Sequence, residues 1–389
     1  MNQTLALIGL PTATLLLTAF LLTTNIFQGA VDVLDKAFGA APKWTQVQNM
    51  VHDPATQDLS HGEKPKEAFL ALEQAWAEPG DARRVMVLGN SQTMAISLAP
   101  GEGPSATPER AWVDLLARQK RAGEVPLLVY RSSTAGLSYT EALWYTHYLA
   151  SHPAVRPDAL VLQLNYQSFW NGGVREGLLE MLDDGAFRKR IEAEAASAQP
   201  YSDTFVQAIR AHTETRREKA GSIREDTPPG MRWDGWVRQE LEAWPPFAQR
   251  AEQRTAFAEL LYRLRVYVLK LTPATARTIS GTRWNASCAA IESIARICRE
   301  SGIRLVLFSA PVNPKVNLYR TPEDRETYRK FVHSLEAADG VRVHDLENTI
   351  PQQYWGMWLT LPDPLHLGRE GHQLMANQMS AILSEELAR

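Results

Sequence analysis

The chain has 389 residues, of which 44% are hydrophobic and 22% charged, and 41 basic against 44 acidic side chains give a formal net charge of −3. This composition excludes a collagen-like fibre, a largely disordered chain and a small disulfide scaffold. A near-neutral charge without a basic block gives no electrostatic footprint for nucleic acid, and a mean hydropathy of −0.28 excludes a protein with many membrane spans.

The first segment of interest, residues 5–27, is apolar and carries no charged side chain. Because about 20 apolar residues cross a bilayer, the segment predicts an N-terminal transmembrane anchor over residues 1–29. A cleaved signal peptide is the alternative, with small residues at 38–41 for cleavage, but residues 1–4 lack the basic side chains that such a peptide has. We expect a single-pass protein of the inner (cytoplasmic) membrane whose folded domain lies on the extracytoplasmic, periplasmic side.

Beyond the anchor, residues 30–80 are of mixed composition with a helical stretch at 66–76, and we interpret them as a stalk. From residue 81 onward, short apolar runs typical of buried strands alternate with helical segments. Strands are predicted at 84–89, 126–131, 158–166, 303–311 and 341–346, and helices at 138–150, 322–338 and 369–387. This alternation predicts an α/β domain over 81–389, a three-layer, flavodoxin-like parallel sheet.

The α/β alternation breaks between about residues 175 and 280, where the chain is charged and helical with a Pro-Pro-Gly interruption at 228–230. We interpret this stretch as a helical insertion into one domain; two independent domains are the alternative. The helix predicted around residues 285–302 contains both cysteines, Cys288 and Cys298. Ten helical residues separate their Cα atoms by about 15 Å, too far for a disulfide, so both are expected to be free thiols.

Ser91 is the first residue that suggests chemistry. It lies in the sequence Gly-Asn-Ser-Gln-Thr at 89–93, directly after the first predicted strand. Active sites of open α/β sheets gather at the carboxyl ends of strands, where a serine hydroxyl faces the cleft and free backbone N–H groups can bind an oxyanion. The same residues also suit an ordinary turn, so this signal needs a second one.

The second signal is an Asp-x-x-His pattern, Asp363 and His366, on a predicted tight proline-containing turn before the last helix. An aspartate there can accept from the imidazole Nδ1–H and leave Nε2 as a general base for a serine. Asp363 could instead cap a turn, with His366 a surface side chain. A metal site of these two residues with His372 is a third interpretation, which no further cluster supports; no metal or cofactor is predicted.

Together, the serine turn after the first strand and the Asp-x-x-His before the last helix resemble the SGNH (GDSL-like) hydrolase superfamily over residues 81–175 and 281–389. The resemblance implies that Ser91 is the nucleophile and that Asp363 and His366 complete a triad. It also implies that Gly136 and Asn165 help form the oxyanion hole. The chain departs from the family pattern in two places: Asn90 stands where the family usually has Asp, and Asn165 lacks the usual Gly-x-Asn-Asp context, which leaves Gln167 as an alternative donor.

Within that superfamily, the apolar N-terminus, the serine block, the segment 308–315 and the final Asp-x-x-His-Leu-Gly are similar to the D-alanyl-transfer protein of teichoic-acid modification and to SGNH-type proteins of exopolysaccharide O-acetylation. This resemblance implies a membrane-tethered O-acyltransferase, with acetyl the expected group, that works beside a membrane-bound O-acyltransferase and modifies a cell-surface or exported polysaccharide acceptor.

Two other functions stay open from the sequence. A tethered carbohydrate esterase or deacetylase would use the same residues with water as the acceptor. A non-catalytic polysaccharide-assembly protein would keep the fold alone. Three tryptophans near predicted strand ends, Trp170, Trp355 and Trp358, suit sugar stacking, although packing is the commoner use of tryptophan.

Overall fold

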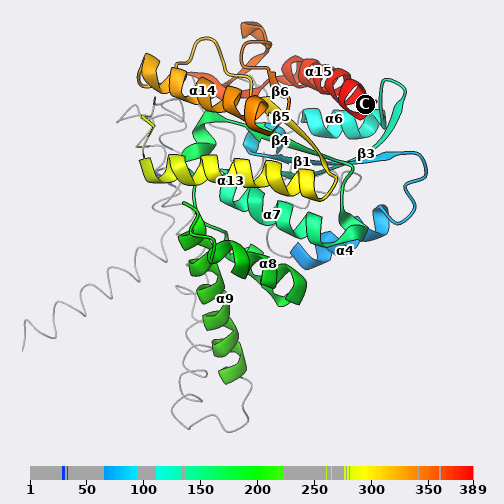
Figure 1. Ribbon diagram of the computed structural model, residues 1–389. Helices are drawn as coiled ribbons and strands as arrows, with labels where there is room; N and C mark the ends of the chain where they lie inside the picture. The colour runs from blue at the N-terminus through cyan, green and yellow to red at the C-terminus, as the bar shows by residue number, and fades with distance from the viewer. Residues whose placement is uncertain are drawn as a thin grey trace, which may run out of the picture. The chain divides into compact units, whose positions relative to one another are not determined.

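The structure is a computed structural model (Figure 1). It describes residues 65–94, 111–133, 136–222, 276, 278–279, 281–339, 341–358 and 361–388, together with positions 29, 30, 33, 260 and 264. No helix within these ranges is long and apolar enough to cross a bilayer. The apolar segment 5–27 lies outside the described residues, so the transmembrane anchor stays a prediction.

The chain divides into two compact units, one of residues Met1–Ala41 and Arg216–Pro273, the other of Pro42–Thr215 and Ala274–Arg389. The second unit contains the main sheet and the candidate site. Its sheet has the strand order β2-β3-β1-β4-β5-β6, and only β2 runs antiparallel to its neighbour. The strands are β1 (Arg83–Gly89), β2 (Arg121–Ala122), β3 (Val125–Ser133), β4 (Ala159–Leu164), β5 (Arg304–Ser309) and β6 (Val343–Asp345).

The five parallel strands, numbered in chain order, lie in the order 2-1-3-4-5, which is the flavodoxin-like arrangement. The predicted parallel α/β sheet is therefore confirmed. Side chains alternate between its two faces, as β1 shows: Met86 and Leu88 belong to one buried cluster, and Val85 and Val87 to the other. Both faces are covered, which explains why the strands are continuous apolar runs.

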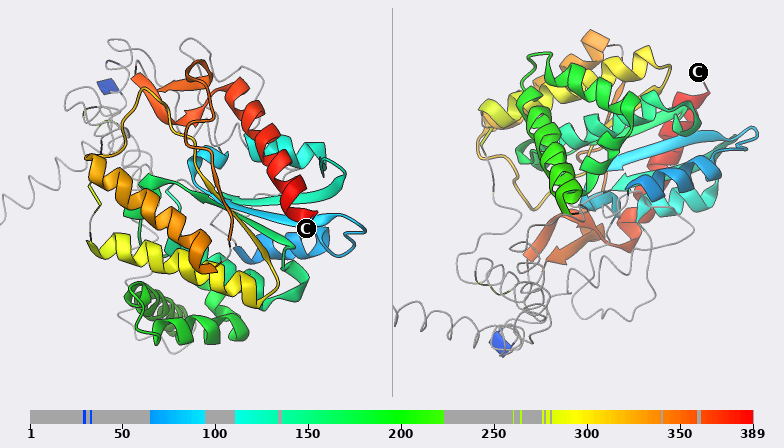
Figure 2. Two further views of the ribbon diagram at one scale, coloured as in Figure 1. Left: turned by 45° about the horizontal axis from the view of Figure 1, so that its top comes forward. Right: turned by 90° about the horizontal axis from the view of Figure 1, so that it is seen from below.

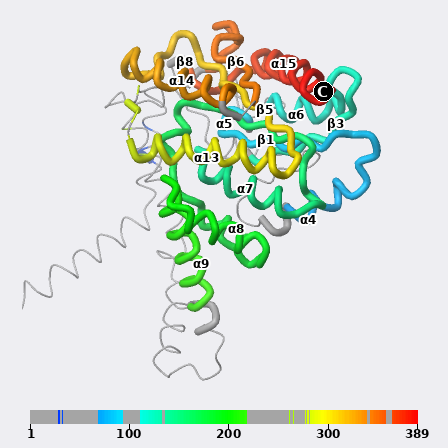
Figure 3. The backbone as a smooth tube through the Cα atoms, in the orientation of Figure 1, coloured from blue at the N-terminus to red at the C-terminus, as the bar shows by residue number. Residues whose placement is uncertain are grey.

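Helices pack on both faces of the sheet, as the two views in Figure 2 show, and Figure 3 traces the chain through the layers. One buried cluster joins the sheet to α7, α13 and α14, and the other joins it to α6 and α15. The helices that form these layers are α6 (Trp112–Gln119), α7 (Tyr139–Ser151), α13 (Gly281–Glu300), α14 (Pro322–Asp339) and α15 (Arg369–Leu387). Both cysteines lie in α13 as free thiols.

Two helices from the predicted stalk and insertion contribute to the core. α4 (Pro65–Ala75) buries Phe69 and Leu72, and Trp76 just after it meets the ring of Tyr130 edge-on, so this part of the predicted stalk packs into the domain. α8 (Gly185–Ala195) places Phe187 edge-on against Trp144 of α7, with ring centroids 5.2 Å apart. α9 (Ser202–Ser222) follows α8, and short 3₁₀ helices lie at Pro153–Val155, Tyr166–Trp170, Glu176–Asp183 and Gln352–Tyr354.

A second, two-stranded sheet lies near the C-terminus. Its strands β7 (Trp355–Trp358) and β8 (Leu361–Leu367) pair antiparallel, with a register shift between Trp355 and Met357. We call this pair the C-terminal ribbon. The sequence predicted a tight proline-containing turn here, with Pro362 and Pro364 in it. The structure places both prolines in β8, which pairs with a single partner strand and can therefore accept residues without an N–H.

Candidate active site

Ser91 is the first residue of a short helix, α5 (Ser91–Met94), and only Asn90 separates it from the end of β1. Asn90 fixes the start of this helix, because its Oδ1 accepts from the Gln92 N–H at 3.0 Å and its carbonyl accepts from the Thr93 N–H at 3.0 Å. Gly89 is required just before it, since a Cβ there would lie 2.2 Å from Cγ2 of Thr93. The tight passage from strand to helix thus presents Ser91 at the carboxyl edge of the sheet.

The structure gives Asn90, which departs from the family pattern, a local role. Its side chain accepts from α5 through Oδ1, and its Nδ2 donates to Oγ of Ser168 at 3.5 Å. A carboxylate could also make the first of these bonds, but it could only accept from the Ser168 hydroxyl, whereas the Asn90 amide donates to it.

Asp363 and His366 lie on β8 of the C-terminal ribbon. Oδ1 of Asp363 accepts from the backbone N–H groups of Leu365 and His366, both at 2.9 Å. Asn313, just after β5, holds the same stretch from outside: its Nδ2 donates to the Asp363 carbonyl at 2.8 Å. The segment 308–315, singled out in the sequence, therefore fixes the ribbon that carries the aspartate and the histidine.

The structure brings Ser91, His366 and Asp363 into one hydrogen-bonded line. His366 Nε2 lies 2.9 Å from Ser91 Oγ, and His366 Nδ1 lies 3.0 Å from both carboxylate oxygens of Asp363. Ser91 and His366 are each 8% exposed and Asp363 is 1% exposed, so the line begins near the surface and ends inside the protein. This is the geometry in which a histidine removes the proton of a serine while an aspartate fixes the ring.

Burial and charge oppose each other in the pKa values of this pair. Burial raises the pKa of Asp363, but the neighbouring His366 and the hydrogen bonds to its carboxylate outweigh burial and hold the pKa below its ordinary value. Burial lowers the pKa of His366, but the charge and hydrogen bond of Asp363 outweigh it and raise the pKa above the ordinary value. The aspartate therefore stays ionised, and the histidine is a stronger base than a free imidazole.

Gly136 and Asn165, the predicted oxyanion residues, follow the two strands that flank β1. Gly136 lies after β3 with a positive φ of 71°, and Asn165 lies one residue after β4. The Asn165 side chain is buried, and its Nδ2 has no hydrogen-bond partner among the described residues. A buried donor without an acceptor carries a desolvation cost, and binding a developing oxyanion would remove that cost.

The amide of Asn165 is held in this orientation by its neighbours. Its Oδ1 accepts from the Gln167 backbone N–H at 2.8 Å, which leaves Nδ2 as the remaining donor. Its backbone N–H donates to the Tyr139 hydroxyl at 2.8 Å, at the start of α7. Gln167, the alternative donor from the sequence, thus acts through its backbone to orient Asn165.

His372 and Trp355 take structural positions. His372 Nδ1 accepts from the Trp112 backbone N–H at 3.1 Å, which ties this ring to the start of α6. Within the described part of the chain, no group of three or more His, Cys, Asp and Glu residues could hold a metal. The Trp355 ring is buried and donates to the Ile350 carbonyl at 3.2 Å, so it packs rather than offering a stacking face.

Two buried glutamines next to the triad were missed by sequence reasoning. Gln92 follows Ser91, and Gln163 lies on β4; they are 1% and 3% exposed. The available signal was a polar residue within an otherwise apolar buried strand, at Gln163.

Comparison with known proteins gives fold-level likenesses. No protein-family model matches the chain, and no curated protein matches it in sequence. Among solved structures, it is similar to Axe2, an acetylxylan esterase from Geobacillus stearothermophilus, at 12% identity and a TM-score of 0.37 over 79% of this chain and 96% of that one. It is also similar to LAE5, an alpha/beta hydrolase enzyme from the metagenome of Lake Arreo, Spain, at 11% identity and a TM-score of 0.37 over 79% and 96%. The reaction is therefore inferred from the geometry of the site alone.

Proposed function

We propose that the protein is a serine enzyme that cleaves O-acyl esters through a covalent acyl-Ser91 intermediate, and that it acts as a carbohydrate esterase. The observation that carries the proposal is the continuous line from Ser91 Oγ through His366 to Asp363, with distances of 2.9 and 3.0 Å. Nδ2 of Asn165, which has no hydrogen-bond partner in the described part of the chain, supports the same chemistry, because an ester carbonyl becomes an oxyanion when the serine attacks it.

The reaction follows from this geometry. Ser91 Oγ bonds to the ester carbonyl carbon while its proton passes to His366 Nε2, and the carbonyl oxygen becomes an oxyanion. When the tetrahedral species collapses, the alcohol leaves with the proton from His366, and the acyl group remains on Ser91. Water then attacks the acyl carbon while giving a proton to His366, and the bond to Ser91 Oγ breaks as His366 returns that proton to Oγ, which releases the carboxylic acid and free Ser91.

Acyl transfer to a polysaccharide is the second candidate, and the apolar segment 5–27 of the sequence favours it. In this reaction a sugar hydroxyl takes the place of water in the second step. A single-pass anchor in the inner membrane would hold the domain on the periplasmic side, where a membrane-bound O-acyltransferase could supply the acyl group. The triad chemistry is the same in both candidates, so the acceptor alone separates them.

The test uses the purified protein with p-nitrophenyl acetate and an acetylated xylo-oligosaccharide, each with and without a sugar acceptor. Acceptor-independent hydrolysis is expected for an esterase, whereas release that requires the acceptor indicates a transferase. Ser91→Ala is expected to lower the rate by about 10⁴- to 10⁶-fold. Ser132→Ala is the matched control, because this buried hydroxyl on β3 has no hydrogen-bond partner among the described residues.

A non-catalytic polysaccharide-assembly protein is the remaining alternative. It would give equal background rates for the wild-type protein, Ser91→Ala and Ser132→Ala. A wild-type rate that Ser91→Ala retains would contradict the assignment of Ser91 as the nucleophile.

A further inference from the structure

The side chain of Gln92 joins the helix that carries Ser91 to the ribbon that carries His366. Its Nε2 donates to the Leu365 carbonyl at 2.6 Å and to the Pro311 carbonyl at 2.9 Å. Its Oε1 accepts from Nε2 of Gln163 on β4. One amide that is 1% exposed therefore binds three segments of the chain, and it is adjacent to Ser91 in sequence.

The bond to Leu365 acts on the backbone of His366. The Leu365 carbonyl and the His366 N–H belong to the same peptide plane, which is rigid. Gln92 holds the carbonyl side of this plane, and Asp363 holds the N–H side at 2.9 Å. With both sides of the plane fixed, the position of the His366 Cα atom relative to α5 is fixed as well.

The orientation of both glutamine amides is set by backbone groups. The Asn90 backbone N–H can only donate, so the atom of Gln163 that it meets at 3.1 Å is Oε1. Nε2 of Gln163 must then face Gln92, whose Oε1 accepts from it, and Nε2 of Gln92 is directed at the two carbonyls, which can only accept. Turning either amide over would place like groups against each other, so the chain of amides has a single arrangement.

We infer that Gln92 is a positioning residue that sets the separation between Ser91 Oγ and His366 Nε2. This inference rests on the proposed acyl-enzyme function for its effect on rate, but its geometric part stands independently. Losing the amide releases the carbonyl side of the 365–366 peptide, and a displacement of about 1 Å in a catalytic group costs on the order of 100-fold in rate.

The main test compares Gln92→Met, which nearly keeps the side-chain volume, with Gln373→Met, the same change at an exposed position of α15. Gln92→Met is expected to lower kcat for p-nitrophenyl acetate and the rate of Ser91 modification by a fluorophosphonate by about 10- to 100-fold. KM is expected to stay within about twofold, because the Gln92 amide is buried and bonded to protein groups, and Gln373→Met is expected to keep both rates. Unchanged rates in a folded Gln92→Met protein would overturn the inference.

Two further measurements keep the test decisive. If Gln92→Met does not fold, Gln163→Met removes the amide behind Gln92 and is expected to give a smaller loss of kcat at unchanged KM; no loss would overturn the inference. If wild-type Ser91 does not react with the fluorophosphonate, the proposed function fails instead. The inference is then decided by crystal structures: the Ser91 Oγ to His366 Nε2 distance should lengthen in Gln92→Met, and its retention at 2.9 Å would overturn the inference.

Discussion

His366 Nε2 lies 2.9 Å from Ser91 Oγ although the two residues are 275 positions apart in the sequence. Ser91 follows the central strand β1 of the main sheet, and His366 belongs to the separate C-terminal ribbon. The two groups therefore meet only when both parts of the fold are in place.

The first prediction concerns Asp363 and the pH dependence of the reaction. His366 must be neutral to accept the serine proton, and its pKa is raised above the ordinary 6.5, so kcat/KM should rise with pH along a limb centred above 6.5. Asp363→Asn removes the charge that raises this pKa and leaves the burial that lowers it. We expect the limb to move to lower pH and the rate to fall by about 10⁴-fold. If the limb of the pH–rate profile lies at the same pH in Asp363→Asn as in the wild-type protein, the charge of Asp363 is not what raises the pKa of His366.

The second prediction concerns Asn165 as an oxyanion donor. Asn165→Asp keeps the shape and the oxygen that accepts from the Gln167 N–H, but it replaces the free N–H₂ by an oxygen. We expect kcat to fall by about 10²- to 10³-fold with little change in KM, because the donor acts on charge that develops in the transition state. Asn377→Asp, on the exposed side of α15, is the control. A raised KM with an unchanged kcat in steady-state kinetics would indicate substrate binding instead.

The third prediction concerns the buried ion pair between Arg131 on β3 and Asp114 on α6. Nη1 of Arg131 lies 2.8 Å from Oδ2 of Asp114, and both side chains are 1% exposed. Arg131→Met leaves the buried carboxylate of Asp114 without its cation. It is expected to lower the free energy of unfolding by about 3–5 kcal/mol. The double variant Arg131→Met, Asp114→Leu should recover most of this loss in urea unfolding. A double variant as unstable as the single one would show that the unpaired charge is not the cause.

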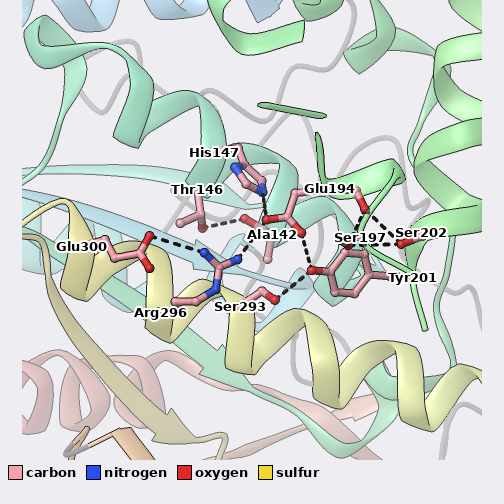
Figure 4. A network of polar contacts seen from close by, with 10 residues as sticks. All are labelled: Ala142, Thr146, His147, Glu194, Ser197, Tyr201, Ser202, Ser293, Arg296 and Glu300. Atoms are coloured by element: carbon pink, nitrogen blue, oxygen red, sulfur yellow. Dashed lines mark hydrogen bonds and ion pairs between the residues drawn. The ribbon is translucent and has the colours of Figure 1, made fainter. Parts of the chain in front are cut away.

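The fourth prediction concerns Glu194 on α8, which lies at the centre of the polar network in Figure 4. Arg296 approaches it at 2.9 Å and Tyr201 donates to it at 2.6 Å, while His147 lies 3.4 Å away. Burial raises the pKa of Glu194, but His147, Tyr201 and Arg296 outweigh it and lower the pKa from 4.5 to about 2. This group therefore contributes stability above about pH 4.5, which is lost as the pH falls towards 2.

Glu194→Gln is thus expected to be less stable than the wild-type protein at pH 7, by up to about 3 kcal/mol, and the difference should narrow between pH 4.5 and 2. Unfolding free energies measured across this range test the expectation. Glu300→Gln, which removes only the exposed partner of Arg296 at 3.4 Å, should change stability by less than about 1 kcal/mol. A difference between Glu194→Gln and wild type that is constant with pH would contradict the role of the ionised carboxylate.

The sequence was sufficient for the parts of the structure that depend on neighbouring residues. The five parallel strands are short apolar runs, and Asp363 and His366 are three residues apart, so their mutual contact is a local property. Gln92 could not be predicted in the same way, because its three partners are 71, 219 and 273 positions away. Nothing near Gln92 in the sequence indicates which carbonyls will face it, since that depends on how the ribbon docks.

The C-terminal ribbon was missed for a different reason. Two prolines within seven residues normally exclude a strand of a buried sheet, and Pro362 and Pro364 are both in β8. They are tolerated because β8 pairs only with β7. Whether a strand has one neighbouring strand or two is decided by tertiary structure, so local sequence patterns cannot predict the number of neighbours.

The nucleophile lies on α5, just after the main sheet, and the base lies on the C-terminal ribbon, and this arrangement has a consequence for how the protein loses activity. The main sheet is packed on both faces, whereas the ribbon has two strands and is held by hydrogen bonds to α5 and by the buried side chains of Trp355, Leu365 and Leu367. Because this contact is smaller than the whole core, opening the ribbon requires less free energy than unfolding the domain. Mild denaturant or heat should therefore abolish the proposed ester hydrolysis at a concentration or temperature at which the main sheet and its helices are still folded. Loss of activity would then report the opening of the ribbon alone. It would be reversible when the denaturant is diluted, because the main sheet and helices against which the ribbon packs have not unfolded.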